Sequence, residues 1–128
     1  MATQSKILLL DDNRDLLQIV QIILKGQGYE TVLASSIEEA EKKIRIYQPA
    51  LIMMDVYVGD QNGCDLCKQV KHEADMVDTR IILMSGDENC STLADYAGAD
   101  DFMTKPFDYN DLLERVQRQM QVKRMTAQ

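Results

Sequence analysis

Short continuous apolar runs alternate along the chain with longer segments in which apolar residues recur every three or four positions. A short apolar run is typical of a strand buried on both faces, whereas the wider spacing is typical of a helix with one buried side. The alternation predicts strands at residues 7–10, 30–34, 51–54, 81–84 and 101–104. It also predicts five helices. Three of them follow caps at Asp12 or Asn13, at Ser36 and at Asp108, and the other two occupy about 64–73 and about 90–97.

Individual residues predict where the helices end and which side of each is apolar. Gly26 and Gly28 end the first helix, and Pro49 ends the second. Ser36 with Glu39 three positions later is typical of a capping box. The apolar sides predicted for these two helices consist of Leu16, Ile19, Val20, Ile23 and Leu24, and of Ile37, Ala40, Ile44 and Tyr47.

Strict alternation of strands and helices predicts the α/β class, with a doubly wound parallel sheet covered by helices on both faces. The first, third and fourth strands are the most apolar, so they belong in the centre of the sheet, and the strand at 30–34 suits an edge. These assignments favour the flavodoxin-like strand order 2-1-3-4-5. In that order the first and third strands are neighbours.

Chain length and charge limit the possible functions. The 128 residues suit a single domain over 1–128, with a core at about 5–120 and a short polar C-terminal tail. A net charge of −7 without a basic cluster argues against direct nucleic-acid binding. The chain shows neither an apolar stretch near 18 residues nor a signal-like leader, so we expect a cytoplasmic protein that does not enter a membrane.

Cys64 and Cys67 form a Cys-x-x-Cys pair, which can indicate a redox or zinc site. A zinc site needs more ligands, and His72 is the only histidine. The pair also lies well beyond the strand ending near Asp55, whereas a redox pair opens a helix directly after a strand. Two small residues on the packed side of a helix explain this spacing better. The three cysteines also fit a reducing compartment.

Polar side chains follow four of the predicted strands. Asp11 and Asp12 follow the first, Asp55 follows the third, Ser85 the fourth and Lys105 the fifth. The carboxyl ends of parallel strands share one edge of the sheet, where open α/β folds bind ligands. Carboxylates, a hydroxyl and an ammonium together suit Mg²⁺ and a phosphoryl group.

Each of these residues also has an ordinary structural explanation. Paired acids after a strand often cap a helix, and Lys105 before Pro106 fits an exposed turn. Ser85 with Gly86 fits a strand-ending turn, although this hydroxyl and amide can also bind phosphoryl oxygens. Their common place at four strand ends favours a functional site.

These motifs together resemble those of the response-regulator receiver domain (CheY-like) of two-component signal transduction. The resemblance extends from Lys6 to about Gln119. The matching segments are Ile7-Leu-Leu-Leu-Asp-Asp12, Leu51-Ile-Met-Met-Asp55, Asn62-Gly63, Leu83-Met-Ser-Gly86 and Ala97-Gly-Ala-Asp-Asp-Phe-Met-Thr-Lys-Pro-Phe107.

The resemblance implies that Asp55 is the phosphoacceptor, which takes a phosphoryl group from a histidine kinase or a histidine phosphotransfer protein. It also implies a Mg²⁺ site in which Asp12 ligates the ion, Asp11 acts directly or through water, and Asp55 and the main-chain carbonyl of Tyr57 are further ligands. Such a domain promotes only its own phosphorylation and dephosphorylation and is not otherwise an enzyme.

Roles in binding and signalling follow from the same resemblance. Lys105, Ser85 and Gly86 would bind the phosphoryl group, and Ser85 with Phe102 would form the conformational switch. Phosphorylation would then change the face made by the fourth helix, the fifth strand and the fifth helix, which an unknown downstream protein would bind. A receiver excised from a hybrid histidine kinase or larger regulator is the alternative.

The chain departs from the family pattern in the loop after Asp55. A Met-Pro pair is common in the family where this chain has Val58 and Gly59, and glycine predicts a more flexible loop. Tyr57 and Asp87 occupy positions that tune the lifetime of the phosphoryl group. We expect Tyr57 to shield it, whereas Asp87 can affect the attacking water in either direction. Phe102 lacks the hydroxyl of the tyrosine often found at its position.

Three other classes are less compatible with the residues. A haloacid-dehalogenase-type hydrolase needs an aspartate two residues after its nucleophile, where this chain has Tyr57. A flavin or nucleotide binder needs a phosphate-binding loop after the first strand, where the acids at 11 and 12 repel phosphate. A degenerate scaffold receiver would lack some of the acid, hydroxyl and lysine positions that are filled here.

Overall fold

Five parallel strands form the central sheet of the computed structural model, which describes residues 6–86, 92, 95 and 97–126. The strands are β1 (Lys6–Leu10), β2 (Glu30–Ala34), β3 (Leu51–Asp55), β6 (Arg80–Ser85) and β7 (Asp101–Thr104). Their order is β2-β1-β3-β6-β7, and every pairing is parallel. The predicted fold class and strand order are therefore confirmed, with β2 at an edge.

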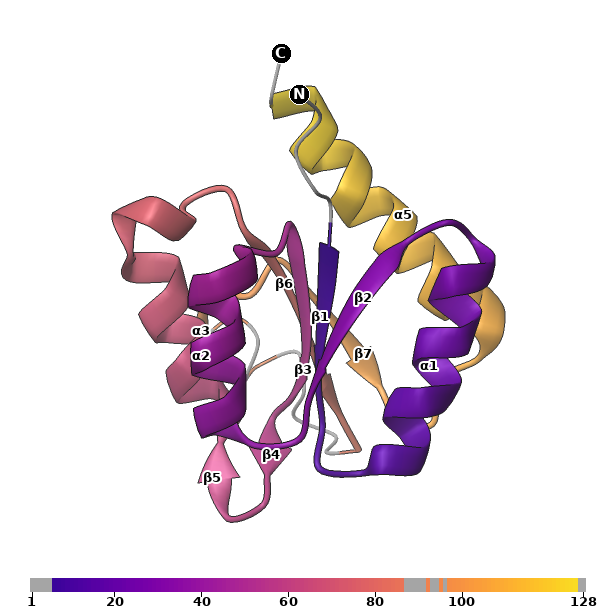
Figure 1. The fold of residues 1–128 in the computed structure, drawn as a ribbon, viewed down its shortest axis with the longest axis horizontal. Coiled ribbons are helices and arrows are strands. Elements are labelled where there is room, and N and C mark those ends of the chain that lie inside the picture. Colours follow the sequence, from indigo (N-terminus) through magenta and orange to yellow (C-terminus); the bar gives the residue numbers. More distant parts are fainter. Residues whose placement is uncertain (1–5, 87–91, 93–94, 96, 127–128) are drawn as a thin grey trace.

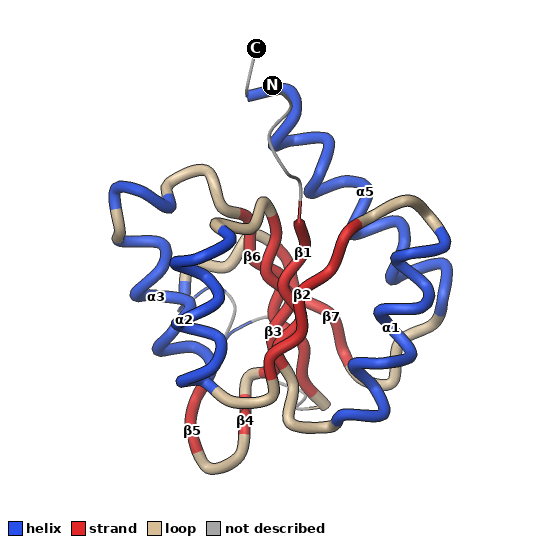
Figure 2. The backbone as a smooth tube through the Cα atoms, in the orientation of Figure 1, coloured by secondary structure: helices blue, strands red, loops and turns tan. Residues whose placement is uncertain are grey.

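Helices cover both faces of this sheet (Figure 1). One face carries α1 (Arg14–Gly26) and α5 (Tyr109–Thr126), and the other carries α2 (Ile37–Tyr47), α3 (Gly63–His72) and the short 3₁₀ helix η1 (Ala74–Met76). Figure 2 shows the same layers, with the strands between two groups of helices. The described residues thus form four α-helices. The helix predicted at 90–97 lies mostly outside the described residues, although Thr92, Asp95 and Ala97 are helical.

The central strands are buried on both faces, which explains their continuous apolar runs. Side chains on the α2 and α3 side include Leu8, Leu10, Ile52, Met54, Ile81 and Leu83. Side chains on the α1 and α5 side include Ile7, Leu9, Leu51, Met53, Ile82 and Met84. All twelve are at most 3% exposed. This double burial fixes the backbone of the strands that carry the site.

The predicted loop after Asp55 contains a small hairpin. Its strands are β4 (Tyr57–Val58) and β5 (Gln61–Asn62), which pair antiparallel. Val58 is 3% exposed and anchors the hairpin in the core, while Gly59 adopts a left-handed φ of 63° at the turn. The loop prediction was therefore incomplete, because one buried side chain and a turn glycine order this short segment. Figure 1 shows the hairpin at the end of the sheet where α1 begins.

Side-chain caps fix the start of each of the four described α-helices, and Asn62 caps α3 by accepting from Cys64 N at 2.7 Å. Asn13 accepts a hydrogen bond from Leu16 N, Ser36 accepts one from Glu39 N, and Asp108 accepts one from Asp111 N. The predicted capping box is shifted by one residue, because the Glu39 carboxylate accepts from the main-chain amide of Ser35 at 2.8 Å. Lys43 holds the same carboxylate at 3.0 Å.

The buried side of α1 differs from the predicted one by a small rotation. Leu17, Val20 and Leu24 are its buried residues, whereas the side chain of Ile19 is 55% exposed. Residues 16, 17, 19, 20, 22 and 23 are all apolar, so the sequence allows two neighbouring faces. Contact with the sheet selects one of them. In α2, Ala40 and Ile44 are buried as predicted, but Tyr47 is exposed.

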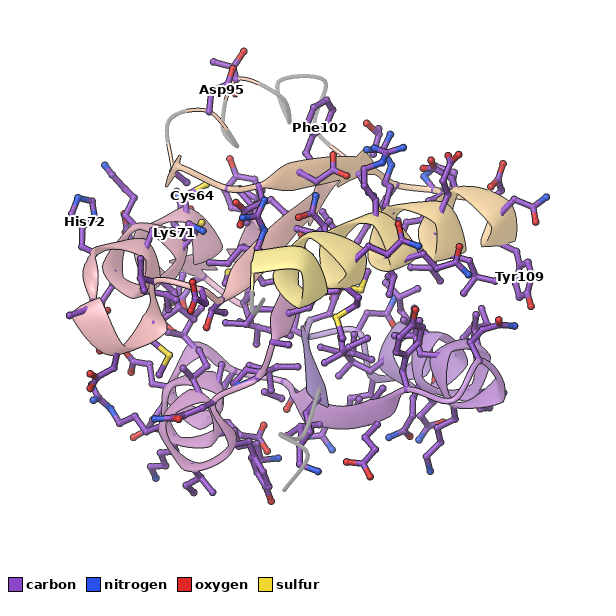
Figure 3. All side chains as sticks on the ribbon, turned by 90° about the horizontal axis from the view of Figure 1, so that it is seen from above. Cys64, Lys71, His72, Asp95, Phe102 and Tyr109 are labelled. Atoms are coloured by element: carbon purple, nitrogen blue, oxygen red, sulfur yellow. The ribbon has the colours of Figure 1, made fainter. Side chains whose placement is uncertain are left out.

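The Cys-x-x-Cys pair lies on the packed side of α3. Cys64 and Cys67 are both buried, and neither forms a disulfide. Burial raises the pKa of both thiols, to about 12 for Cys67. A raised thiol pKa disfavours the reactive thiolate, so the packing interpretation is supported. Figure 3 places Cys64 at the inner side of α3, while His72 points outward from the other end. Within the described residues, none of the helices is suited by length and apolar character to cross a membrane.

Gly63 provides the first prediction, because its main chain packs closely against the end of β3. A Cβ atom at Gly63 would overlap the main-chain oxygen of Asp55, and Gly63 N donates to Val56 O at 2.5 Å. Gly63→Ala should therefore lower the free energy of unfolding by about 1–3 kcal/mol, since backbone atoms must shift. Urea denaturation measures this change.

Gly26→Ala is the matched control for Gly63→Ala. Nothing lies within 4 Å of a Cβ built at Gly26, which is the last residue of α1. This substitution should leave stability unchanged or raise it by up to about 1 kcal/mol. Equal stability of the two variants would contradict the close contact at Gly63.

Candidate functional site

The parallel register brings the polar strand ends to one edge of the sheet. Leu10 pairs with Met54, Asp55 pairs with Met84, and Ser85 pairs with Thr104. The residues that follow these pairs therefore leave the sheet side by side. All five polar positions predicted from the strand ends, which are Asp11, Asp12, Asp55, Ser85 and Lys105, lie at this edge.

The Lys105 ammonium joins two of the carboxylates. Its Nζ lies 2.6 Å from Asp11 Oδ2 and 3.1 Å from Asp55 Oδ2. The side chain of Asp11 is 1% exposed and that of Asp55 is 14% exposed, so both ion pairs are largely screened from water. The Lys105–Pro106 peptide bond is cis. One lysine thus links the ends of β1, β3 and β7.

Three carboxylates form a group that can hold a divalent cation. Ligand atoms of Asp11, Asp12 and Asp55 all lie within 4.8 Å of one another. Asp11 Oδ1 accepts from Asn13 N at 3.0 Å, and Asp12 Oδ2 accepts from Gly59 N at 2.9 Å. Such hard oxygen donors, partly open to water on the Asp12 side, fit Mg²⁺ better than zinc or copper.

Ser85 and Gly86 complete the edge on the side of β6. Ser85 is buried at 2% exposure, and its main-chain oxygen accepts from Lys105 N at 2.8 Å. Gly86 is exposed, so the two residues pass from the core to the surface. Their backbone is thereby fixed beside the lysine. Their predicted roles in binding and switching remain predictions.

Tyr57 and Phe102 come from different strands, β4 and β7. Tyr57 N approaches Asp55 Oδ1 at 3.4 Å, and its side chain is 53% exposed. Phe102 is half-buried against the core, with the Arg115 guanidinium carbon 5.9 Å from its ring centroid. Figure 3 shows the Phe102 ring extending outward from β7. Asp87, the other residue predicted to tune phosphoryl lifetime, lies outside the described residues.

Two contributions to the site were missed by the sequence reasoning. The Gly59 amide holds Asp12, and the missing side chain of Gly63 lets the α3 start approach Asp55. Gly63 was noted only within the Asn62-Gly63 segment and Gly59 only as a departure from the family pattern. Their contacts were not predicted, because a main-chain donor leaves no signature of its partner in the sequence. Arg115, which contacts Phe102, was also not anticipated.

Burial and charge act in opposite directions on the ion pairs. Desolvation raises the pKa of Asp55, and the neighbouring Lys105 offsets this only in part. For Lys105, desolvation lowers the pKa, but the hydrogen bonds that its ammonium donates to Asp11 and Asp55 outweigh this effect and raise the pKa. Lys105 is therefore a permanent cation at neutral pH, while the ionised form of Asp55 is destabilised by its surroundings.

The raised pKa of Asp55 predicts a pH-dependent stability difference. Native Asp55 holds its proton more tightly than the unfolded chain does, so stability is lost as pH rises through the native pKa. In buffer without divalent cations, Asp55→Asn should be more stable than the wild type at pH 7, because asparagine cannot ionise. The difference should vanish below about pH 3.9, the unfolded pKa of an aspartate. Urea denaturation across this range tests it, and a less stable variant at pH 7 would contradict the dominance of desolvation.

Comparison with known proteins is consistent with this geometry. The family model described as response regulator receiver domain matches residues 7–117. The alkaline phosphatase synthesis transcriptional regulatory protein PhoP of Bacillus subtilis is 35% identical over 111 residues, which cover 87% of this chain and 46% of that protein. The chain spans about half the length of the curated relatives it matches.

Solved structures show the same similarity. A putative response regulator from Chloroflexus aurantiacus has a TM-score of 0.84 and 30% identity, and the match covers 90% of this chain and 96% of that one. A CheY-like response regulator receiver domain protein from Methanospirillum hungatei has a TM-score of 0.86 and 26% identity, with coverage of 95% and 98%. The chain belongs to the family of response regulator receiver domains of two-component systems.

Proposed function

We propose that this chain accepts a phosphoryl group on Asp55 in a Mg²⁺-dependent reaction. The donor is a phosphohistidine of a histidine kinase or of a histidine phosphotransfer protein. The observation that carries the proposal is the Lys105 ammonium held between Asp11 and Asp55, with Asp12 beside them. A purely structural ion pair would not need a third carboxylate within 4.8 Å.

The chemistry assigns separate roles to these groups. A carboxylate oxygen of Asp55 forms a bond to phosphorus as the bond between phosphorus and the donor imidazole nitrogen breaks, and the imidazole leaves with that electron pair. Lys105 neutralises negative charge on the transferred group. Asp11, Asp12, Asp55 and the Tyr57 carbonyl would hold Mg²⁺, which supplies further charge neutralisation when bound.

Signalling requires a surface that responds to the new phosphate. In the proposal, Ser85 and the Gly86 amide bind phosphoryl oxygens, and Phe102 changes position on β7. The affected face comprises the predicted fourth helix (about 90–97) together with β7 and α5, and a downstream protein binds it. Phosphorylation replaces the single negative charge of the Asp55 carboxylate with about two charges and adds phosphoryl oxygens as hydrogen-bond acceptors, enough to bias a two-state segment.

The cellular setting is part of the proposal. We infer that the protein works in the cytoplasm, through protein contacts and without direct nucleic-acid binding. The net charge of −7 supports this, because nucleic-acid binding needs clustered cations. The same site would serve in a domain that works alone or in one that belongs to a hybrid histidine kinase or larger regulator. The reaction is confined to the chain's own aspartate and makes it no enzyme toward other substrates.

Intact-mass measurement after incubation with a small phosphodonor tests the phosphoacceptor. The wild type should gain the mass of one phosphoryl group when Mg²⁺ is present and much less when a chelator removes it. Asp55→Asn should gain none, because an amide oxygen cannot act as the nucleophile. An unmodified wild type, or equal modification of the two proteins, would reject the proposal.

The exposed ring of Tyr57 provides a second test of the same site. Tyr57 N lies near Asp55, and its side chain can cover a phosphoryl group from water. The phosphorylated wild type should therefore keep its phosphate longer than Tyr57→Ala in a single-turnover decay assay. Tyr47→Ala is the control, since Tyr47 is a comparably exposed tyrosine near Lys6 at the other edge of the sheet. Faster phosphate loss from the wild type than from Tyr57→Ala would refute shielding.

A further inference from the structure

A main-chain contact joins two loops that are far apart in the sequence. The amide of Gly59, at the turn between β4 and β5, donates to Asp12 Oδ2 at 2.9 Å across 47 residues. Asp12 belongs to the loop between β1 and α1, just before the helix cap Asn13. The contact therefore connects the hairpin to the carboxylate group at the edge of the sheet.

Asp12 differs from the other two carboxylates in how it is held. Lys105 binds Asp11 and Asp55, which are both largely buried, whereas Asp12 is exposed. Its negative charge repels the neighbouring acids, so a free side chain would turn toward water. In the described part of the chain, the hydrogen bond that Asp12 accepts comes from the Gly59 amide.

Gly59 is suited to this contact by its backbone conformation. Its φ of 63° lies in the left-handed region, which glycine adopts without strain. The pairs Tyr57–Asn62 and Val58–Gln61, together with the buried Val58 side chain, fix the turn in place. A proline here would have no N–H and would require a φ of about −65°, so it could not make the contact.

We propose that the Gly59 amide is a positioning group for Asp12, and that the hairpin thereby helps to set the affinity of the site for divalent cations. This inference rests on the metal site in the proposed function. The amide occupies one lone pair of Oδ2, and the remaining lone pairs of the carboxylate stay available for a cation. Because the side chain is already held near Asp11 and Asp55, cation binding requires less ordering.

Direct Mg²⁺ titration without any phosphodonor tests the role of the amide. Gly59→Pro removes the N–H, whereas Gly59→Asn keeps it and tolerates the left-handed conformation. A Cβ at this position meets open space, so the asparagine side chain fits. Calorimetry or amide chemical shifts should show Mg²⁺ binding about threefold to tenfold weaker for Gly59→Pro, the equivalent of one hydrogen bond. Gly59→Asn should stay within about twofold of the wild type.

Several results would overturn the proposal. Equal or tighter binding by Gly59→Pro would show that the amide does not position Asp12. Equal weakening by Gly59→Asn would assign the effect to the hairpin conformation and not to the N–H group. A wild type that binds no Mg²⁺ would reject the metal site and this inference together, whereas normal wild-type binding with an unaffected proline variant would reject the inference alone.

An independent readout does not involve the metal. In metal-free protein, the Gly59 amide proton should be shifted downfield and protected from exchange by its charged acceptor. Asp12→Ala should move that resonance upfield and speed its exchange, while Asp15→Ala, an exposed acid of α1, should leave it unchanged. An unchanged Gly59 resonance in Asp12→Ala would contradict the contact.

Discussion

The placement of one ammonium between the buried carboxylate of Asp11 and the largely buried carboxylate of Asp55 is the interaction on which the site depends. Asp11 and Asp55 leave neighbouring strands and are 1% and 14% exposed, so their charges would repel strongly without a cation. Lys105 offsets that repulsion and ties β7 to β1 and β3. The continuous apolar strands make this arrangement rigid, since their side chains are packed on both faces of the sheet. The site therefore holds mutually repelling carboxylates on a sheet whose packed strands cannot move apart to reduce the repulsion.

The third carboxylate is held in a different way. Asp12 faces water and depends on a main-chain donor in a two-strand hairpin, whereas Asp11 lies in the interior. Oxygen donors that are partly fixed and partly accessible suit a cation that keeps several water ligands, as Mg²⁺ does. The hairpin is also the segment in which this chain departs most from the family pattern. Under the proposed function, differences from relatives in cation affinity and phosphoryl lifetime are expected to originate in this hairpin.

Sequence patterns predicted local features well where a single physical rule applied. Apolar runs and their alternation with helix-spaced segments predicted all five strands of the sheet. Polar residues before the helices predicted caps at Asp12 or Asn13, at Ser36 and at Asp108, and the structure selects Asn13 for the first. Prediction was weaker where nearby residues have the same chemical character, such as adjacent apolar or serine residues. Leu17 replaced Ile19 on the buried side of α1, and Glu39 reached Ser35 where Ser36 was expected. In both cases the alternatives lie one or two positions apart, and only contacts with the rest of the fold distinguish them.

The amino-acid sequence alone determined the fold class, the strand order and the set of residues at the carboxyl edge, because these follow from the spacing of hydrophobic and polar residues within short segments. Only the tertiary structure decided that Lys105 binds Asp11 as well as Asp55, and that Gly59 donates to Asp12. These contacts join residues 94, 50 and 47 positions apart. Their geometry depends on how strands and turns pack together, and a main-chain amide has the same chemistry at every non-proline residue, so no local pattern could reveal its partner.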